Sequence, residues 1–418
     1  MEDIGLREVS SSENCLSLEP PDGGLYAWLS VVAGFFVIMN TWGLVISFGV
    51  FQSYYISTLN RSSSDISWIG SLNVFLLFFS GIASGRLTDA GHFHAVSNLG
   101  ASLIILGTFM ASICTQYWQL MLAQGICIGL GNGCLLTPTM AVIATYFKRR
   151  LPLVLGLAAC GSVTGGLIYP GMARTLLPSV GFGWTMRSIG FVEAGTLAVA
   201  MLCIRTRIPP AKPRVFIDWT AFRESEFSLY TLGAFLSFLG VFVPFFFLTS
   251  FAKETLGLSY TKSLDLILVL NGIGFVARVF PGVLAKYIGT LNTFIILVFS
   301  SSVCLYTWIA VHSIGGLYAW VTFYSLAIGG VQALFPAAVS SLTSDLSQLG
   351  SRMGLIFAAV GIGALIGSPI SGVIISSSGS YVGAQAFAGS ALLLGGIFIS
   401  AAREIRRRKL GKELFTKL

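Results

Sequence analysis

The chain has 418 residues, of which 55% are hydrophobic and only 10% are Asp, Glu, Lys or Arg. Because soluble domains carry about a quarter charged residues, this composition excludes a soluble globular protein. The net charge of +8 comes from basic residues that are scattered among short polar stretches, with one cluster at the carboxyl terminus. This distribution indicates membrane topology rather than a nucleic-acid partner.

Apolar stretches of roughly 20 residues, long enough to cross a bilayer as helices, recur along the whole sequence. In chain order they predict twelve spans, near residues 25–52, 66–88, 95–114, 118–146, 152–176, 184–204, 227–251, 264–286, 290–312, 316–341, 353–376 and 381–402. The longest internal polar stretch separates the sixth span from the seventh. The sequence therefore predicts an all-α membrane protein with two six-helix bundles.

These spans divide the chain into five parts. We expect a cytoplasmic tail over 1–24, a first bundle over 25–204, a cytoplasmic linker over 205–226, a second bundle over 227–402 and a basic cytoplasmic tail over 403–418. The first tail is polar and acidic without an apolar core, which argues against a cleaved signal peptide.

The basic residues also predict an orientation. If the amino terminus is cytoplasmic, the outer segments hold only Arg61, Arg174, Lys253 and Lys262, and every other basic loop is cytoplasmic. By the positive-inside rule, this asymmetry predicts that both termini are cytoplasmic. We expect a multi-pass protein of the plasma membrane. Asn60 begins an Asn-Arg-Ser pattern in the first outer loop, which predicts a glycoprotein.

The two halves of the sequence repeat each other. The run GLGNGCLLTP in the fourth span ends at Pro138, and AIGGVQALFP in the tenth ends at Pro336. The fifth and eleventh spans share glycines that precede a proline: Gly161, Gly165, Gly166 and Pro170 in one, Gly361, Gly363, Gly367 and Pro369 in the other. These matches predict pseudo-symmetric bundles with a site between them, the plan of transporters that work by alternating access.

Several short motifs identify a family. They are Pro21-Asp22-Gly23-Gly24 with Ala27-Trp28, Phe48-Gly49-Val50-Phe51-Gln52 with Tyr54-Tyr55, and Tyr146-Phe147 before Lys148-Arg149-Arg150. On these residues the chain resembles the major facilitator superfamily and, within it, the fungal branch of the monocarboxylate porter family. The likeness covers nearly the whole chain. Asp22 is also placed to cap the first helix.

The loop after the second span, from Gly85 to Gly91, resembles the superfamily's G-x-L-A-D-R-x-G loop, although it is one residue shorter and lacks the Arg after Asp89. The counterpart in the second half has Lys286 where the Asp would stand. The resemblance implies a gating role for Gly85, Asp89 and Lys286, within a weakened network of cytoplasmic charges.

An Arg at the centre of a bilayer costs about 2.5–3.5 kcal/mol on insertion scales, so it usually has a function. Arg278 lies deep in the eighth span, and Asn271 lies two turns earlier on the same face. The resemblance implies that Arg278 binds a substrate carboxylate; the alternative is a structural Arg paired with an acid or backbone carbonyls. The Asp and Lys that serve proton coupling in the family are replaced by Gly274 and Ile46, which argues against that coupling mechanism.

Glu193 in the sixth span is the other buried charge. Two interpretations stay open: a proton site, or a structural partner of Arg187 or of a neighbouring helix. Asp265 lies near Lys262 at an outer end, which predicts an interfacial ion pair.

In the superfamily the first, fourth, seventh and tenth spans line the substrate cavity. Their polar and aromatic side chains, with one Tyr of the fifth span, predict an aromatic pocket that has few charges. Besides Arg278 and Asn271, the candidate substrate-binding residues are Asn40, Trp42, Asn132, Tyr169, Gln332 and Phe335.

The leading functional prediction is a secondary transporter that moves a small organic solute by alternating access. The solute would be a carboxylate or a bulkier amphipathic metabolite, and export of a secondary metabolite is one direction. The alternatives are a vitamin or monocarboxylate uptake porter and a non-transporting membrane sensor on the same fold.

Other classes of protein lack support in the sequence. It contains no HExxH, no GxSxG and no His cluster, so we expect neither an enzyme nor a metal or other cofactor. It also has no phosphate-binding loop of an ATP-driven pump. We expect a monomer whose partners are a small organic substrate and the lipid bilayer.

Overall fold

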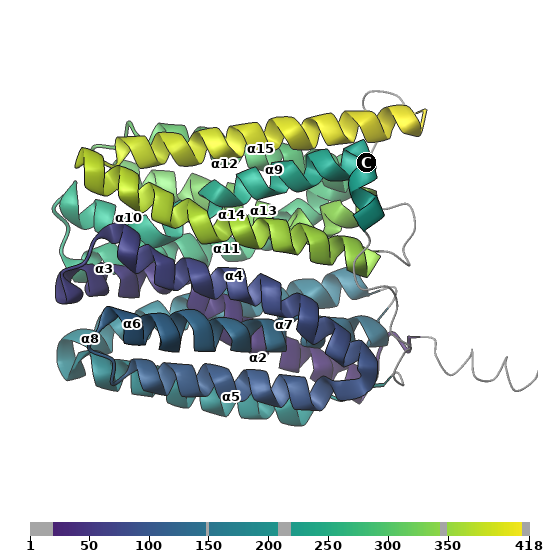
Figure 1. The fold of residues 1–418 in the computed structure, drawn as a ribbon, viewed down its shortest axis with the longest axis horizontal. Coiled ribbons are helices and arrows are strands. Elements are labelled where there is room, and N and C mark those ends of the chain that lie inside the picture. Colours follow the sequence, from purple (N-terminus) through teal and green to yellow (C-terminus); the bar gives the residue numbers. More distant parts are fainter. Residues whose placement is uncertain (1–19, 148–149, 208–218, 343–348, 412–418) are drawn as a thin grey trace, which may run out of the picture.

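A computed structural model describes residues 20–147, 150–207, 219–342 and 349–411. Within these ranges the regular structure is helical, with no β-strand. The predicted tail up to residue 19, linker residues 208–218 and residues 412–418 lie outside the described part. Figure 1 shows two bundles of long, nearly parallel helices lying side by side, the amino-terminal half below and the carboxyl-terminal half above.

The first bundle contains five long helical segments and the shorter pieces that extend them. In chain order they are α2 (Leu25–Ile46), α3 (Phe48–Leu59), α4 (Ser63–Leu87), the π-helical turn η1 (Thr88–His92), α5 (Phe93–Ala111), α6 (Tyr117–Leu120), the π-helical segment η2 (Met121–Cys127), α7 (Ile128–Tyr146) and α8 (Leu151–Cys203).

The second bundle follows the short helix η3 (Trp219–Arg223). Its helices are α9 (Ser225–Val241), α10 (Val243–Glu254), α11 (Tyr260–Ile288), α12 (Thr290–Trp308), α13 (Ile314–Leu342), α14 (Leu349–Ser378) and α15 (Val382–Lys409).

Eleven helical stretches in the described ranges are long and apolar enough to cross a bilayer. One of them, the 53-residue α8, contains both the predicted span 152–176 and the predicted span 184–204. The chain bends at Gly181, whose φ of 77° lies in the left-handed region that favours glycine. Because α8 is long enough for two crossings, the described ranges accommodate the twelve predicted spans, and the prediction of an all-α membrane fold is confirmed.

The first span of each bundle is interrupted in the same way. The break between α2 and α3 falls at Ser47, with φ −89° and ψ −5°. The break between α9 and α10 falls at Phe242, with φ −89° and ψ −9°. The two bundles thus repeat one local backbone geometry, as expected for a duplicated unit.

Glycines also occupy equivalent contacts in the two bundles. Each packs its α-carbon against a backbone carbonyl of the first span of its own bundle. In the first bundle Gly161 packs against Phe35 and Gly165 against Met39; in the second, Gly363 packs against Phe235 and Gly367 against Leu239. A side chain at any of these positions would collide with that carbonyl oxygen, so the close crossings of α8 on α2 and of α14 on α9 require glycine.

The basic segment after residue 402 differs from the predicted tail, because α15 continues as a helix to Lys409. Glu404 pairs with Arg407 at 2.7 Å and with Arg408 at 2.9 Å, one turn further along the helix. Lys409 reaches Glu226 at the start of α9, at 2.6 Å. These pairs stabilise the helix beyond the apolar segment.

Asp22 does not cap the first helix, so that local prediction is wrong. The N-cap of α2 is Gly24, and no side chain caps it. Instead the Asp22 N–H donates to the carbonyl of Tyr146 at 3.0 Å, and its carboxylate accepts from the N–H of Arg150 at 3.5 Å. Asp22 therefore ties the start of the first span to the connection between α7 and α8.

Candidate substrate site between the bundles

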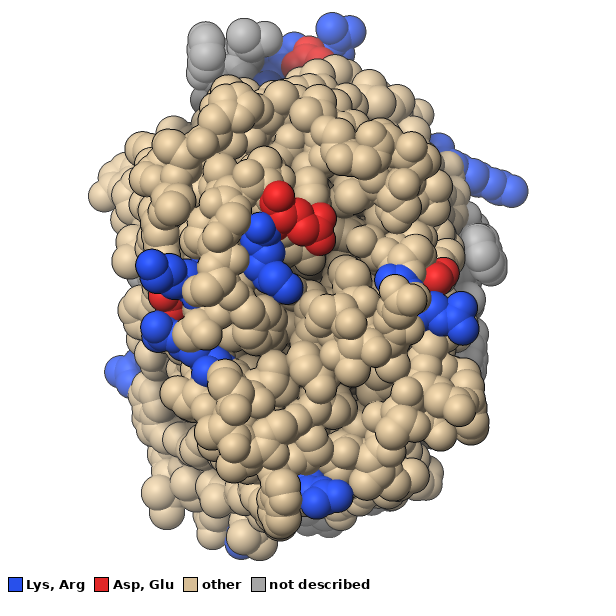
Figure 2. All heavy atoms as spheres, turned by 90° about the vertical axis from the view of Figure 1, so that its left-hand side faces the viewer, with Lys and Arg blue, Asp and Glu red and all other residues tan. Residues whose placement is uncertain are grey.

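The two bundles are held together at the end opposite the termini, which lies on the left of Figure 1. Bonds across the interface at this end join the Tyr260 hydroxyl to the Val50 carbonyl (3.0 Å), the Ser64 hydroxyl to the Pro369 carbonyl (3.0 Å) and the Arg174 guanidinium to Asp265 (3.1 Å). Figure 2 shows this end as a continuous surface of mostly uncharged side chains. We call these contacts, together with the deeper bond from the Asn271 amide to the Gly166 carbonyl, the outer closure.

Asp265 pairs across the bundles with Arg174 and not with the predicted Lys262. Deeper in the interface, Asn271 of α11 donates to the Gly166 carbonyl of α8 at 2.8 Å and is 3% exposed. The Arg174–Asp265 pair is partly exposed, so it contributes about 0–1 kcal/mol. A buried hydrogen bond whose removal leaves a carbonyl without a donor costs about 1–3 kcal/mol.

We therefore expect Asn271→Ala to loosen the outer closure more than Arg174→Ala does. The measurement is the rate at which a membrane-impermeant maleimide, added from the side of the outer closure, labels a Cys introduced at Val50, which is buried and contributes only its carbonyl to the closure. Asn271→Ala should raise this rate several-fold, and Arg174→Ala should leave it near the parent rate. Equal rates in the two variants would contradict the assignment.

Arg278 lies at the interface of α11 with α8 and α13. Its Nη2 donates to the amide oxygen of Gln332 at 3.4 Å, and its guanidinium interacts electrostatically with the Cys160 thiol of α8. Within the described ranges, its buried Nη1 has no hydrogen-bond partner and no acidic side chain pairs with it. The amide nitrogen of Gln332 is buried and unpartnered as well. The site thus presents hydrogen-bond donors, one of them cationic, for which the described chain supplies no acceptor.

Six aromatic rings from both bundles meet beside this site, with centroid separations from 5.1 to 6.4 Å between neighbours. We call them the aromatic cluster; they are Trp42, Phe78, Phe238, Phe242, Phe335 and Phe357. Trp42 stacks on Phe242 of the other bundle with 11° between the ring planes. Such a cluster provides apolar, planar surfaces.

The cation and the aromatic cluster are neighbours because α13 carries both Gln332 and Phe335, one helical turn apart. Trp42 and Phe335 were predicted from the sequence. Phe78 and Phe357 were not, because they lie in the second and eleventh spans, outside those expected to line the cavity. Phe238 and Phe242 lie in the seventh span but were not predicted either. The signal that could have found Phe78 is its position at the middle of the second span, whereas Phe357 lies near the start of the eleventh.

Three predicted substrate-binding residues lie inside the first bundle instead. The Tyr169 hydroxyl donates to the amide oxygen of Asn40 at 2.6 Å, and both side chains are fully buried. Asn132 donates to the amide oxygen of Asn73 at 2.9 Å, between α7 and α4. The structure therefore brings together Arg278 and Gln332 with the aromatic cluster, and separates Asn40, Tyr169 and Asn132 from them.

The gating candidates lie at the opposite end from the outer closure. Gly85 packs beside Thr137 of α7, since a Cβ at Gly85 would lie 3.1 Å from the Thr137 methyl group. Lys286 is exposed in the last turn of α11. Asp89 belongs to η1, and its side chain lies outside the described part.

Asn60 is exposed in a left-handed turn between α3 and α4, where an acceptor asparagine would be accessible.

Glu193 lies in the second half of α8, is fully buried, and has no hydrogen-bond partner for either carboxyl oxygen among the described residues. The predicted structural partner does not hold it: Arg187 bonds to Ser112 at 3.3 Å and stacks on Trp184 at 5.0 Å.

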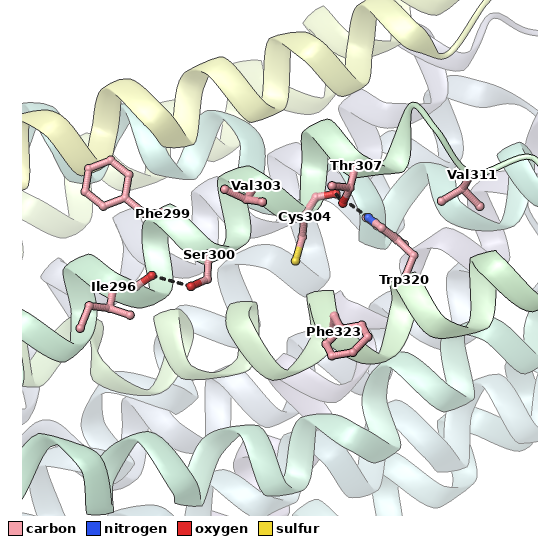
Figure 3. A pocket seen from close by; sticks show the side chains of 9 residues that line it. All are labelled: Ile296, Phe299, Ser300, Val303, Cys304, Thr307, Val311, Trp320 and Phe323. Carbon is pink, nitrogen blue, oxygen red and sulfur yellow. Dashed lines mark hydrogen bonds between the residues drawn. The ribbon is translucent and has the colours of Figure 1, made fainter.

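A groove of about 700 Å³ lies elsewhere, on the surface between α12 and α13 (Figure 3). Val303 and Phe323 on its walls are 60% and 65% exposed. The hydroxyls of Ser300 and Thr307 bond to backbone carbonyls of their own helix. Because these polar groups are satisfied internally, the groove suits lipid rather than a polar solute.

The sequence pattern of the Major Facilitator Superfamily matches residues 31–347. The chain belongs to this superfamily. This match agrees with the membrane-spanning helices and with the interface between duplicated bundles. The chain is therefore a multi-pass membrane transporter for a small organic solute.

Fungal transporters are among the curated relatives that the chain matches. An MFS-type transporter of Gibberella zeae is 46% identical over 387 residues, which cover 92% of this chain and 88% of that protein. The Aspyridones efflux protein apdF of Emericella nidulans is 33% identical over 417 residues, or 97% and 85% of the two chains. The Agnestins efflux protein AgnL12 of Paecilomyces divaricatus is 35% identical over 402 residues, or 94% and 92%.

Proposed function

We propose that this transporter exports an aromatic organic acid, a secondary metabolite, by alternating access, with Arg278 binding the anionic group. The observation that carries the proposal is the half-buried Arg278, whose buried Nη1 has no partner among the described residues and lies beside the aromatic cluster. A guanidinium suits planar anions, and flat rings suit aromatic ones. Two relatives that are named as efflux proteins support the direction.

The finer assignments belong to the same proposal. Within the superfamily, we place the chain in the fungal branch of the monocarboxylate porter family, on the motifs around Asp22 and Tyr146. The termini are cytoplasmic and the membrane is the plasma membrane, which the distribution of basic residues supports. The transporter acts as a monomer, is glycosylated at Asn60 and catalyses no reaction. The outer closure then shuts the extracellular side.

The test is a comparison of metabolites in cells and in the medium, with and without this gene. An aromatic acid that accumulates inside cells when the gene is removed is the expected result. A compound left unused in the medium would contradict export and support an uptake porter. No change in any metabolite would contradict transport and favour the sensor.

A further inference from the structure

The groove between α12 and α13 lies between two membrane-spanning helices of the second bundle, so its occupant comes from the bilayer. Its wall on the α12 side extends from Ile296 to Val311, which is at most about 22 Å at about 1.5 Å per residue. A volume of about 700 Å³ over that length gives a mean cross-section of at least about 30 Å². This is wider than one extended hydrocarbon chain and suits a plate of fused rings.

The walls of the groove are largely aromatic. Phe299 comes from α12, and Trp320 and Phe323 come from α13 (Figure 3). The indole N–H of Trp320 donates to the Cys304 carbonyl, which ties the two helices together beneath the groove. Planar, apolar walls favour a ligand that is itself flat and apolar.

Charge distinguishes between the classes of membrane lipid. Neither α12 nor α13 contains Asp, Glu, Lys or Arg, and residues 309–313 between them have only His312 as an ionisable side chain. A phospholipid phosphate therefore finds no Lys or Arg on these helices or in the turn between them. A single hydroxyl head needs only one partner. Thr307 is exposed near the end of α12, and its hydroxyl oxygen can accept a hydrogen bond while it donates to the Cys304 carbonyl.

The groove is connected to the break in the first span of the second bundle. Trp320 is 5% exposed and stacks on Trp308 at 4.6 Å and on Tyr324 at 5.0 Å. The Tyr324 hydroxyl donates to the carbonyl of Val241, the last residue of α9, at 3.1 Å. The break follows at Phe242, which belongs to the aromatic cluster between the bundles. A ligand in the groove thus packs against a stack of rings that ends at this break.

We propose that the groove binds a membrane sterol, and that bound sterol stabilises the conformation in which the outer closure is shut. The rings of the sterol lie between α12 and α13, and its hydroxyl donates to Thr307. A ligand that fits the groove in this arrangement favours the arrangement over others. This inference goes beyond the proposed function, and neither its binding nor its effect on the closure requires a known substrate.

Binding is tested with cholesterol that carries a photoreactive diazirine, in phosphatidylcholine vesicles that contain the full chain. Peptides from residues 296–323 should be labelled, and unlabelled cholesterol should compete. Val303→Trp fills the groove and should lower the yield about tenfold, which corresponds to about 1.4 kcal/mol. Phe323→Ala, which removes a wall without adding volume, should lower it as well. Val199→Trp is the matched control, because Val199 is 43% exposed on α8 of the other bundle.

Equal labelling of the wild type and both groove variants would overturn the sterol site. Labelling by photoreactive phosphatidylcholine that cholesterol does not displace would assign the groove to a phospholipid chain, and would overturn it too. Groove peptides that neither lipid labels would point to another occupant, such as a second copy of the chain, with the same consequence.

The effect on conformation is tested by maleimide labelling of the Cys introduced at Val50. Cholesterol should lower the labelling rate several-fold in the wild-type background and leave it unchanged in Val303→Trp. Mirror-image cholesterol alters the bilayer in the same way but does not match a chiral groove, so it should have no effect. Equal effects of the two mirror images would show a property of the bilayer and overturn regulation through the groove.

Transport provides a second readout with 1-naphthalenesulfonate, an aromatic anion whose charge does not titrate. Cholesterol should slow its exchange several-fold in the wild type and not in Val303→Trp, because the transporter must leave the closed arrangement to complete a cycle. Exchange that cholesterol does not slow would overturn the regulation. Absence of wild-type exchange would count against the proposed function, while photolabelling and maleimide labelling would still decide on the sterol site.

Discussion

Replacing Arg278 with Gln is expected to reduce exchange of 1-naphthalenesulfonate by the reconstituted transporter by roughly tenfold to a hundredfold. The estimate follows because a hydrogen bond to a charged group contributes about 1.5–3 kcal/mol, and every 1.4 kcal/mol is tenfold in affinity. Arg278→Lys should retain part of the activity, since it keeps the charge but not the two-pronged geometry. The measurement is the initial rate of exchange as a function of probe concentration.

Thermal unfolding of the same variant separates binding from a structural role. Removing a half-buried cation that lacks an acidic partner in the described part of the chain should leave the melting temperature of Arg278→Gln unchanged or raise it. Arg61→Gln, in an exposed outer turn, serves as the control and should transport normally. A variant that unfolds at lower temperature yet binds the probe normally would show that Arg278 supports the fold and not the substrate.

Replacing Gly367 with Ala is expected to prevent correct packing of the second bundle. In most helices this change stabilises by about 0.5–1 kcal/mol, because Gly is a poor helix former. Here the added methyl group meets the Leu239 carbonyl, and backbone cannot move aside as a side chain can. Overpacking typically costs about 1–3 kcal/mol, so we expect Gly367→Ala to destabilise the protein instead of stabilising it.

The matched control is Gly156→Ala in α8, where no atom lies within 4 Å of an added Cβ. We expect a symmetrical, wild-type elution profile on size-exclusion chromatography in detergent for Gly156→Ala, and aggregated protein for Gly367→Ala. The equivalent change at Gly165 in the first bundle should behave like the change at Gly367. Two well-folded variants at Gly165 and Gly367 would refute the role of the carbonyl contacts.

The sequence contained most of the information on the spans and on the duplication. Apolar length and repeated glycines are local properties, so Gly165 and Gly367 could be recognised before any contact was known. The direction in which a polar side chain points is different. In a membrane helix every face is apolar, and no amphipathic pattern distinguishes the interior of a bundle from the interface between bundles.

Because of this ambiguity, some residues that were predicted to share the substrate site lie elsewhere in the structure. Asn40 and Tyr169 are polar residues in the correct spans, yet they satisfy each other inside one bundle. The pairing of Asp265 with Arg174 joins residues that are 91 positions apart, and proximity in sequence favoured Lys262 instead. Such partners depend on how the bundles meet, which no local pattern encodes.

The outer closure has a consequence for how this transporter can diverge. In three of its bonds, a side chain of one bundle donates to a main-chain oxygen of the other, at Val50, Gly166 and Pro369. Val50 and Pro369 can therefore change residue type without losing the acceptor, provided that the helix backbone stays in place. Gly166 cannot, because an added Cβ would lie 2.8 Å from the Asn271 side chain. Selection can then change the residue at an accepting position of one bundle while the donating side chain of the other bundle stays the same. These main-chain bonds of the outer closure therefore tolerate substitutions that would break a closure made of ion pairs.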